Sequence, residues 1–192
     1  MKKDKGTTVF EVLVTIALAA LLLGAAAPNL RSYKLKQESD TAAREILRHL
    51  TKARELAVFS GKEVLFCGVD DNMKCTRDKI KKFVVFVDEN GDRKVNQKEK
   101  IEFELAAEFD GSLHLRASSR AGFIRYHNDG RAHPYGSFYL CPKKEDKYLI
   151  RRISANMSGR SYVARPLENG LVAHVDKKPI NCNALPEDEP DL

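Results

Sequence analysis

The hydrophobic and polar positions of this chain follow three successive patterns. No charged residue occurs between Val12 and Leu30, a length close to the ~20 residues that a helix needs to cross the hydrocarbon of a bilayer. From Leu35 to Ala57 the apolar residues recur at helical spacing and charged residues fill the other positions, which predicts an amphipathic helix with one buried stripe. From Lys62 onward, short apolar runs broken by turn residues predict β-strands.

These patterns predict an α+β fold. A long N-terminal α-helix, with a membrane-spanning first half and an amphipathic second half, is expected to pack on an antiparallel β-sheet. Ser60-Gly61 is the expected end of the helix, because glycine accepts the left-handed conformation that often closes one. The strands are expected at residues 63–67, 80–87, 100–105, 113–116, 123–127, 137–141, 148–155 and 161–165.

Length and composition fit a single globular domain after the apolar helix. The chain has 192 residues and a net charge of +6, and the part after the apolar helix has the size of one ordinary domain. Residues 184–192 are rich in acidic residues and proline, and we expect a disordered acidic tail there.

Four cysteines, Cys67, Cys75, Cys141 and Cys182, are compatible with an oxidising compartment. None forms a Cys-x-x-Cys pair, so a zinc ribbon or a thioredoxin-like site is not expected. Four cysteines allow three pairings, and four free buried thiols are the alternative. The preferred pairing is Cys67–Cys75, which closes a short loop, with Cys141–Cys182, which ties the C-terminal segment to a strand.

One loop has the spacing of a calcium site. Its oxygen-bearing side chains fall near the positions used by an EF-hand loop; they are Asp88, Asn90, Asp92, Asn96 and Glu99. However, Gly91 stands at the fourth position of the loop, Arg93 takes the place of the turn glycine, and the flanks are predicted strands. A polar hairpin turn built on Asn-Gly is therefore favoured over a metal site, and we expect no cofactor.

The N-terminus resembles the class III signal of type IV pilins and type II secretion pseudopilins. The resemblance rests on the basic head ending in Gly6, on Glu11 at the start of the apolar run, and on Pro28. It implies that a prepilin peptidase cuts between Gly6 and Thr7 and methylates the new terminus, although Thr7 stands where the family usually has Phe. Glu11 would then pair with the Thr7 amine of a neighbouring subunit, so that two costly charges neutralise each other.

Two other interpretations of the N-terminus remain open. Gly24-Ala-Ala-Ala27 could imitate the cleavage site of an ordinary secretory signal, or the run could be a plain single-span anchor. Both leave Glu11 without a role.

The downstream segments are similar to the GspH/FimT group of minor pilins and pseudopilins. The similarity rests on Asn-Asp-Gly-Arg at 128–131, on a strand ending at Cys141, and on Ser-Gly-Arg at 158–160 after an Ile-rich strand. It implies five parts: a leader peptide (1–6), a transmembrane and filament-core helix (7–30), an amphipathic helix (31–60), a periplasmic β-sheet domain (61–183) and the acidic tail (184–192).

Basic residues gather in the second half of the chain. From Ser112 to Arg165 there are eleven Lys and Arg against three acidic residues. Such a face could hold double-stranded DNA by phosphate contacts, as some FimT-like pilins do. The candidate contacts are Arg125, Arg131, Arg151, Arg152, Arg160 and Arg165. The Gly-Arg-x-Arg feature of those receptors is incomplete, since Tyr162 follows Gly159-Arg160-Ser161.

An enzyme is not expected, because the five histidines are scattered and no phosphate-binding glycine loop is present. The resemblance implies a minor pilin or pseudopilin that assembles into, or initiates at the tip, a type IV pilus or a type II secretion pseudopilus. Its expected partners are other pilins in a helical filament, the prepilin peptidase and the inner-membrane assembly platform. It would first lie in the inner membrane as a single-pass protein with a periplasmic C-terminal domain. A DNA receptor at the pilus tip and an unrelated anchored binding protein are the alternatives.

Overall fold

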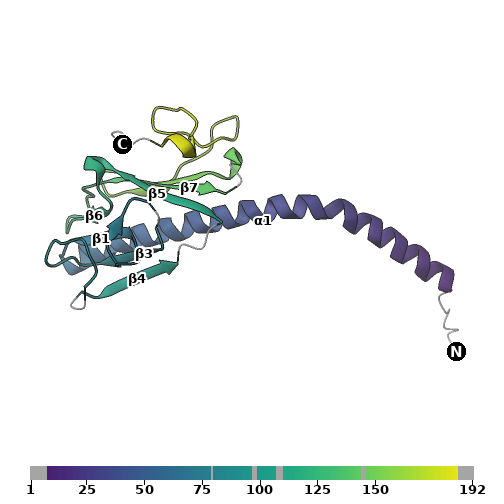
Figure 1. Ribbon diagram of the computed structural model, residues 1–192, viewed down its shortest axis with the longest axis horizontal. Helices are drawn as coiled ribbons and strands as arrows, with labels where there is room; N and C mark the ends of the chain where they lie inside the picture. Colours follow the sequence, from purple (N-terminus) through teal and green to yellow (C-terminus); the bar gives the residue numbers. More distant parts are fainter. Residues whose placement is uncertain (1–7, 79, 97–98, 107–109, 144–145, 186–192) are drawn as a thin grey trace. The chain divides into compact units, whose positions relative to one another are not determined.

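A computed structural model describes residues 8–78, 80–96, 99–106, 110–143 and 146–185, without the side chains of residues 22–32 and 106. The chain divides into two units, residues 1–37 and 38–192, which are considered separately. Helix α1 comprises Val9–Ser60. In the second unit, its C-terminal part packs with two antiparallel sheets (Figure 1).

The amphipathic pattern determines which face of α1 is buried in the second unit. Ala43, Ile46, Leu50, Ala53 and Ala57 are all at most 1% exposed, and they recur every three or four residues, so they form one stripe along the helix. The amide of Gly61 donates to the carbonyl oxygen of Ala57 (3.0 Å), and Gly61 adopts a φ of +69°. The helix therefore ends where the sequence predicts, with glycine in the left-handed conformation.

The first sheet has the strand order β2-β1-β3-β4, and β6 also pairs with β1. Its strands are β1 (Val64–Val69), β2 (Cys75–Thr76), β3 (Lys82–Phe86), β4 (Ile101–Ala106) and β6 (Ile124–Tyr126). Strand β2 lies beside the C-terminal end of β1 and β6 beside its N-terminal end. The two-residue strand β2 was not predicted, because it is too short to show a periodic pattern.

The second sheet has the order β5-β7-β8-β9. Its strands are β5 (Gly111–Ala117), β7 (Gly136–Pro142), β8 (Arg151–Ala155) and β9 (Ser161–Val163). Three short 3-10 helices complete the described structure: η1 (Ser118–Arg120), η2 (Lys147–Leu149) and η3 (Cys182–Ala184). Residues 148–149 were predicted as strand but lie in η2, where the side chain of Asp146 accepts a hydrogen bond from the amide of Tyr148.

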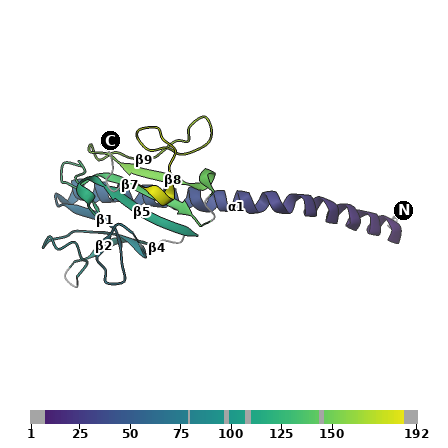
Figure 2. The ribbon, with the colours of Figure 1, turned by 45° about the horizontal axis from the view of Figure 1, so that its top comes forward.

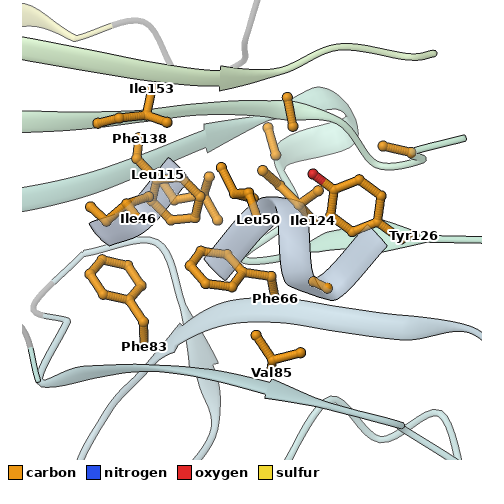
Figure 3. Close-up of a cluster of buried hydrophobic side chains, with 14 of the residues drawn as sticks. Ile46, Leu50, Phe66, Phe83, Val85, Leu115, Ile124, Tyr126, Phe138 and Ile153 are labelled. Atoms are coloured by element: carbon orange, nitrogen blue, oxygen red, sulfur yellow. The ribbon is translucent and has the colours of Figure 1, made fainter. Parts of the chain in front are cut away.

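The prediction of a single sheet is wrong, because the strands divide into two sheets around one core. Figure 3 shows Ile46 and Leu50 of α1 lying between side chains of the two sheets. Phe66 and Phe83 of the first sheet stack at 5.6 Å, and Phe138 of the second sheet meets both rings edge-on at 5.2 and 5.3 Å. One helical stripe therefore contacts an inner face of each sheet, which buries more apolar surface than one sheet would.

The C-terminal segment, residues 164–185, covers the outer face of the second sheet (Figure 2). Val172 and Ile180 pack there against Tyr139 and Ile150. The disulfide Cys141–Cys182 links β7 to η3, and Cys67–Cys75 links β1 to β2. Both preferred pairings are therefore present, and each joins elements that already lie side by side.

His174 belongs to this C-terminal segment and is half-buried beside Tyr139. The Tyr139 hydroxyl lies 3.2 Å from His174 Nδ1. Burial lowers the pKa of His174 below its ordinary value, and the charge of Arg152 acts in the same direction, while Asp176 opposes both. The folded chain therefore binds this proton less readily than the unfolded chain does.

We expect the melting temperature to decrease when the pH is lowered from 7.5 to 5.5, because the pH then passes below the unfolded imidazole's pKa of about 6.5. The His174→Gln variant, which cannot be protonated, should lose less over the same interval. Melting curves of both proteins at the two pH values provide the measurement. An equal decrease in both proteins would show that His174 does not cause it.

Candidate functional site

The N-terminus of α1 is built around Thr8 and Glu11. The amide of Thr8 donates to Glu11 Oε2 (3.0 Å), and the amide of Glu11 donates to Thr8 Oγ1 (3.3 Å). The Thr8 hydroxyl also lies 3.2 Å from Glu11 Oε2. This reciprocal pair is a capping box, which satisfies amides that the first turn of a helix leaves unpaired. Glu11 therefore has a partner in its own chain, a role that the sequence analysis did not assign.

Several predictions about the two ends of the chain concern residues that the structure does not describe. Gly6 and Thr7, the predicted cleavage site, lie outside the described residues, as do residues 186–192 of the predicted tail. Pro28 lies within the bounds of α1. In the part of the chain that is described, no helix carries an apolar stretch long enough to cross a membrane.

Two arginines of the predicted DNA-binding face are buried. Arg151 Nε donates to Asp40 Oδ1 at 2.7 Å, and the same guanidinium donates to the carbonyl oxygens of Tyr148 and Ile150, both at 2.8 Å. Arg152 is only 6% exposed. The prediction that these two arginines belong to a phosphate-binding face is therefore corrected. Arg151 links β8 to α1 through Asp40, and Arg152 lies beneath the C-terminal segment.

The other four candidate arginines reach the surface to different degrees. Arg125 lies 3.6 Å from Glu63, and Arg131 lies 2.6 Å from Asp129. Arg160 and Arg165 are exposed. Acidic neighbours reduce the positive potential that two of these side chains offer to a phosphate. DNA binding through the four residues stays a prediction.

The two Gly-Arg motifs meet in space. Gly130 and Gly159 have φ values of +80° and +79°, and Arg54 Nε donates to the Gly130 carbonyl oxygen at 2.9 Å. A Cβ atom on Gly159 would overlap that same oxygen. The glycines are therefore required by the close approach of two turns to α1, so this part of the resemblance reflects packing.

The calcium-like loop is a connection between β3 and β4, which are antiparallel neighbours. Carboxylate oxygens of Asp88, Asp92 and Glu99 lie within 4.8 Å of one another. Asp88 accepts from the amides of Gly91 (2.8 Å) and Arg93 (3.0 Å). The backbone hydrogen bond from Lys94 is the main cause that holds the pKa of Asp92 below its ordinary value. The loop closes on its own amides, as a polar hairpin connection does, and we assign no metal to it.

The structure brings together four residues that sequence reasoning did not connect, from β5 and from the loop before β3. Ser112 Oγ lies 2.9 Å from His114 Nε2, and Asp78 Oδ1 lies 2.5 Å from His114 Nδ1. Arg116 also reaches Asp78 Oδ1, at 3.1 Å. Partial burial alone would raise the pKa of Asp78, but the hydrogen bonds from His114 and Arg116 outweigh it and lower the pKa. Only the Ser-x-His spacing at 112–114 is visible in the sequence, since Asp78 belongs to a distant loop.

Ser112 and His114 line a cavity of about 970 Å³. Apolar side chains of Ile150, Leu171 and Ile180 also line it, together with the sulfur-bridged Cys141 and Cys182. Lys143 and Lys147 contribute cations. The cavity therefore combines apolar walls with a few polar groups, as small-molecule sites usually do.

Comparisons with known proteins agree with the resemblance seen in the sequence. The model of the family "Type II transport protein GspH" matches residues 42–159, which is more than half of the chain. No curated protein sequence matches the chain.

Solved structures of minor pilins and pseudopilins are among those that it resembles. The type IV minor pilin FimU of Pseudomonas aeruginosa is 20% identical, with 66% of this chain and 88% of that one covered and a TM-score of 0.47. The minor pseudopilin EpsH of Vibrio cholerae is 15% identical, with 69% and 97% covered and a TM-score of 0.49.

The family match begins at residue 42, in the C-terminal part of α1, and ends at residue 159, in the turn before β9. The chain therefore belongs to the GspH family, in the group of GspH/FimT-like minor pilins and pseudopilins.

Proposed function

We propose that this protein is a minor subunit that initiates a type IV pilus or a type II secretion pseudopilus at its tip. A prepilin peptidase removes residues 1–6. Before assembly, the chain is anchored in the inner membrane with its sheet domain in the periplasm. The assembly platform moves residues 7–30 from the bilayer into the helical core of the filament, and residues 31–60 carry the domain on its surface.

The observation that carries this proposal is the exposed apolar surface at the start of α1. Val9, Phe10 and Leu21 are 78%, 75% and 72% exposed, and Leu13 and Ile16 are each 62% exposed. Apolar surface of this extent is unfavourable in water, so it needs lipid or the apolar helices of other subunits. A filament core supplies such helices.

Glu11 has two candidate partners at different stages. In the single chain its carboxylate accepts hydrogen bonds from Thr8, which lowers the cost of holding a charged group among apolar residues. In the filament, the same carboxylate would pair with the Thr7 amine of a neighbour. A carboxylate can accept several hydrogen bonds, so the two contacts need not exclude each other.

The Glu11→Gln variant separates these roles. Glutamine still completes a capping box but carries no charge to neutralise an amine. We expect the Glu11→Gln and Glu11→Ala variants to be exported with a folded domain, yet to be nearly absent from sheared filaments. Immunoblots of the sheared and cell-bound fractions measure this.

A Thr8→Val variant is the matched control, because it removes the hydroxyl of the capping box and leaves the charge of Glu11. Normal incorporation of Glu11→Gln would show that hydrogen bonding, and not charge, is what Glu11 supplies. Loss of all three variants from the periplasm would point instead to a failure of export or folding.

A further inference from the structure

The hydrogen bonds around His114 fix its protonated nitrogen. An ionised carboxylate only accepts hydrogen bonds, so His114 Nδ1 must donate to Asp78 Oδ1 across their 2.5 Å separation. In the neutral ring, Nε2 then carries the lone pair and accepts from the Ser112 hydroxyl at 2.9 Å. This is the tautomer in which a histidine acts as a general base toward serine.

The fold holds the three groups in place from two elements. Ser112 and His114 are two residues apart on β5, so their side chains lie on the same face of the second sheet. The loop before β3 lies along the free edge of β5, where the amide of Leu115 donates to the carbonyl oxygen of Arg77 (2.9 Å). This contact brings the adjacent Asp78 beside His114. Arg116, on the same face of β5, donates to the same carboxylate oxygen, Asp78 Oδ1, at 3.1 Å.

The nucleophile is accessible and adjoins a binding space. Ser112 is exposed, and it lines the cavity of about 970 Å³ together with His114. Ile150, Leu171 and Ile180 give this cavity its apolar surface. A short acyl chain fits this chemistry, because it buries apolar area and leaves its ester group near the polar pair.

We propose that Ser112, His114 and Asp78 form a hydrolytic site for small carboxylic esters, with Ser112 as nucleophile, His114 as base and Asp78 as positioning residue. This activity is additional to filament assembly and does not depend on it.

The reaction balances with water as the only co-reactant. Ser112 Oγ attacks the ester carbonyl carbon while His114 Nε2 takes the hydroxyl proton. The bond to the alcohol oxygen breaks, and the alcohol leaves with the proton from His114. Water then attacks the acyl-serine and gives a proton to His114, and the carboxylic acid departs as the Ser112 hydroxyl is restored.

The negative oxygen that forms in each step needs a hydrogen-bond donor, and we assign this role to the backbone amide of Leu113. Leu113 is two residues from Leu115 on β5, so its N–H points to the same edge of the sheet as that of Leu115. It belongs to the residue after the nucleophile, as one oxyanion donor of α/β-hydrolases does.

The experiment uses the full-length chain in a mild detergent, with both disulfides formed. Two probes are applied: a fluorophosphonate, whose attachment site is found by peptide mass spectrometry, and p-nitrophenyl butyrate, whose hydrolysis is followed by absorbance. We expect the label on Ser112. The Ser112→Ala variant should lose hydrolysis at least tenfold, and His114→Gln should lose about a hundredfold in the labelling rate.

Two control variants carry the same kinds of substitution at other positions on the surface. Ser158→Ala removes an exposed serine whose hydroxyl donates to Asn156 (2.8 Å), and His127→Gln removes a histidine paired with Glu63 at 2.7 Å. Both should keep the wild-type rates. Asp78→Asn should slow labelling about tenfold, and Asp78→Glu should recover part of that loss because it restores the carboxylate.

Hydrolysis by Ser112→Ala within twofold of the wild-type rate overturns the proposal, as does labelling spread over several serines. Ser112 is exposed, so its alanine variant is expected to fold, and its melting curve checks this. Filament incorporation of Ser112→Ala should be normal, which separates failure of this site from failure of the proposed assembly role.

Discussion

Replacing Arg151 with methionine should lower the free energy of unfolding by about 3 kcal/mol, as expected for breaking a largely buried ion pair by removing one partner. The Arg151 side chain is 9% exposed and joins β8 to Asp40 of α1. The substitution leaves the Asp40 carboxylate without its cation. It also leaves the carbonyl oxygens of Tyr148 and Ile150 without this donor. Methionine fills much of the same volume, so the effect should come from the lost polar contacts.

Urea denaturation of the full-length chain in non-ionic detergent measures this difference. The matched control is Arg131→Met, because Arg131 also pairs with an aspartate, at 2.6 Å, but its side chain is 74% exposed. An exposed ion pair contributes at most about 1 kcal/mol. Equal losses in the two variants would contradict the structural role given to Arg151.

Gly159→Ala is expected to be at least as damaging, with a loss of about 3 kcal/mol or more from left-handed strain and steric overlap together. At φ +79°, the added Cβ overlaps the carbonyl oxygen of Gly130 and lies 3.0 Å from Arg54 Nε. The turns that contain Gly130 and Gly159 would have to move apart. The added Cβ meets both atoms of the hydrogen bond from Arg54 to Gly130, so we expect that bond to be disturbed as well.

Gly61→Ala is the control for this variant. Gly61 also has a positive φ, +69°, but a Cβ there has no atom of the described structure within 4 Å. Its substitution should therefore cost only the conformational strain, about 1 kcal/mol. Thermal melting of both variants tests the difference. A Gly159→Ala protein as stable as Gly61→Ala would mean that the two turns do not approach each other as closely as in this structure.

The sequence alone determined the local features, because these depend on periodicity and on residues close together in the chain. The 3.6-residue repeat predicted the buried stripe of α1 that contains Ile46 and Leu50. Short apolar runs predicted most strands, and Ser60-Gly61 predicted the end of α1. Glu11 stood out because a carboxylate is costly in an apolar segment, and the family followed from that residue with Gly6 and the downstream motifs.

Tertiary structure decided everything that depends on long-range contacts. Periodicity gives a strand its two faces but does not choose its neighbours, so the division into two sheets was missed. Charge is visible in the sequence whereas burial is not, and for that reason Arg151 was assigned to the surface. Asp78 meets His114 only because a loop before β3 lies along the edge of β5, and no pattern in the chain encodes that contact.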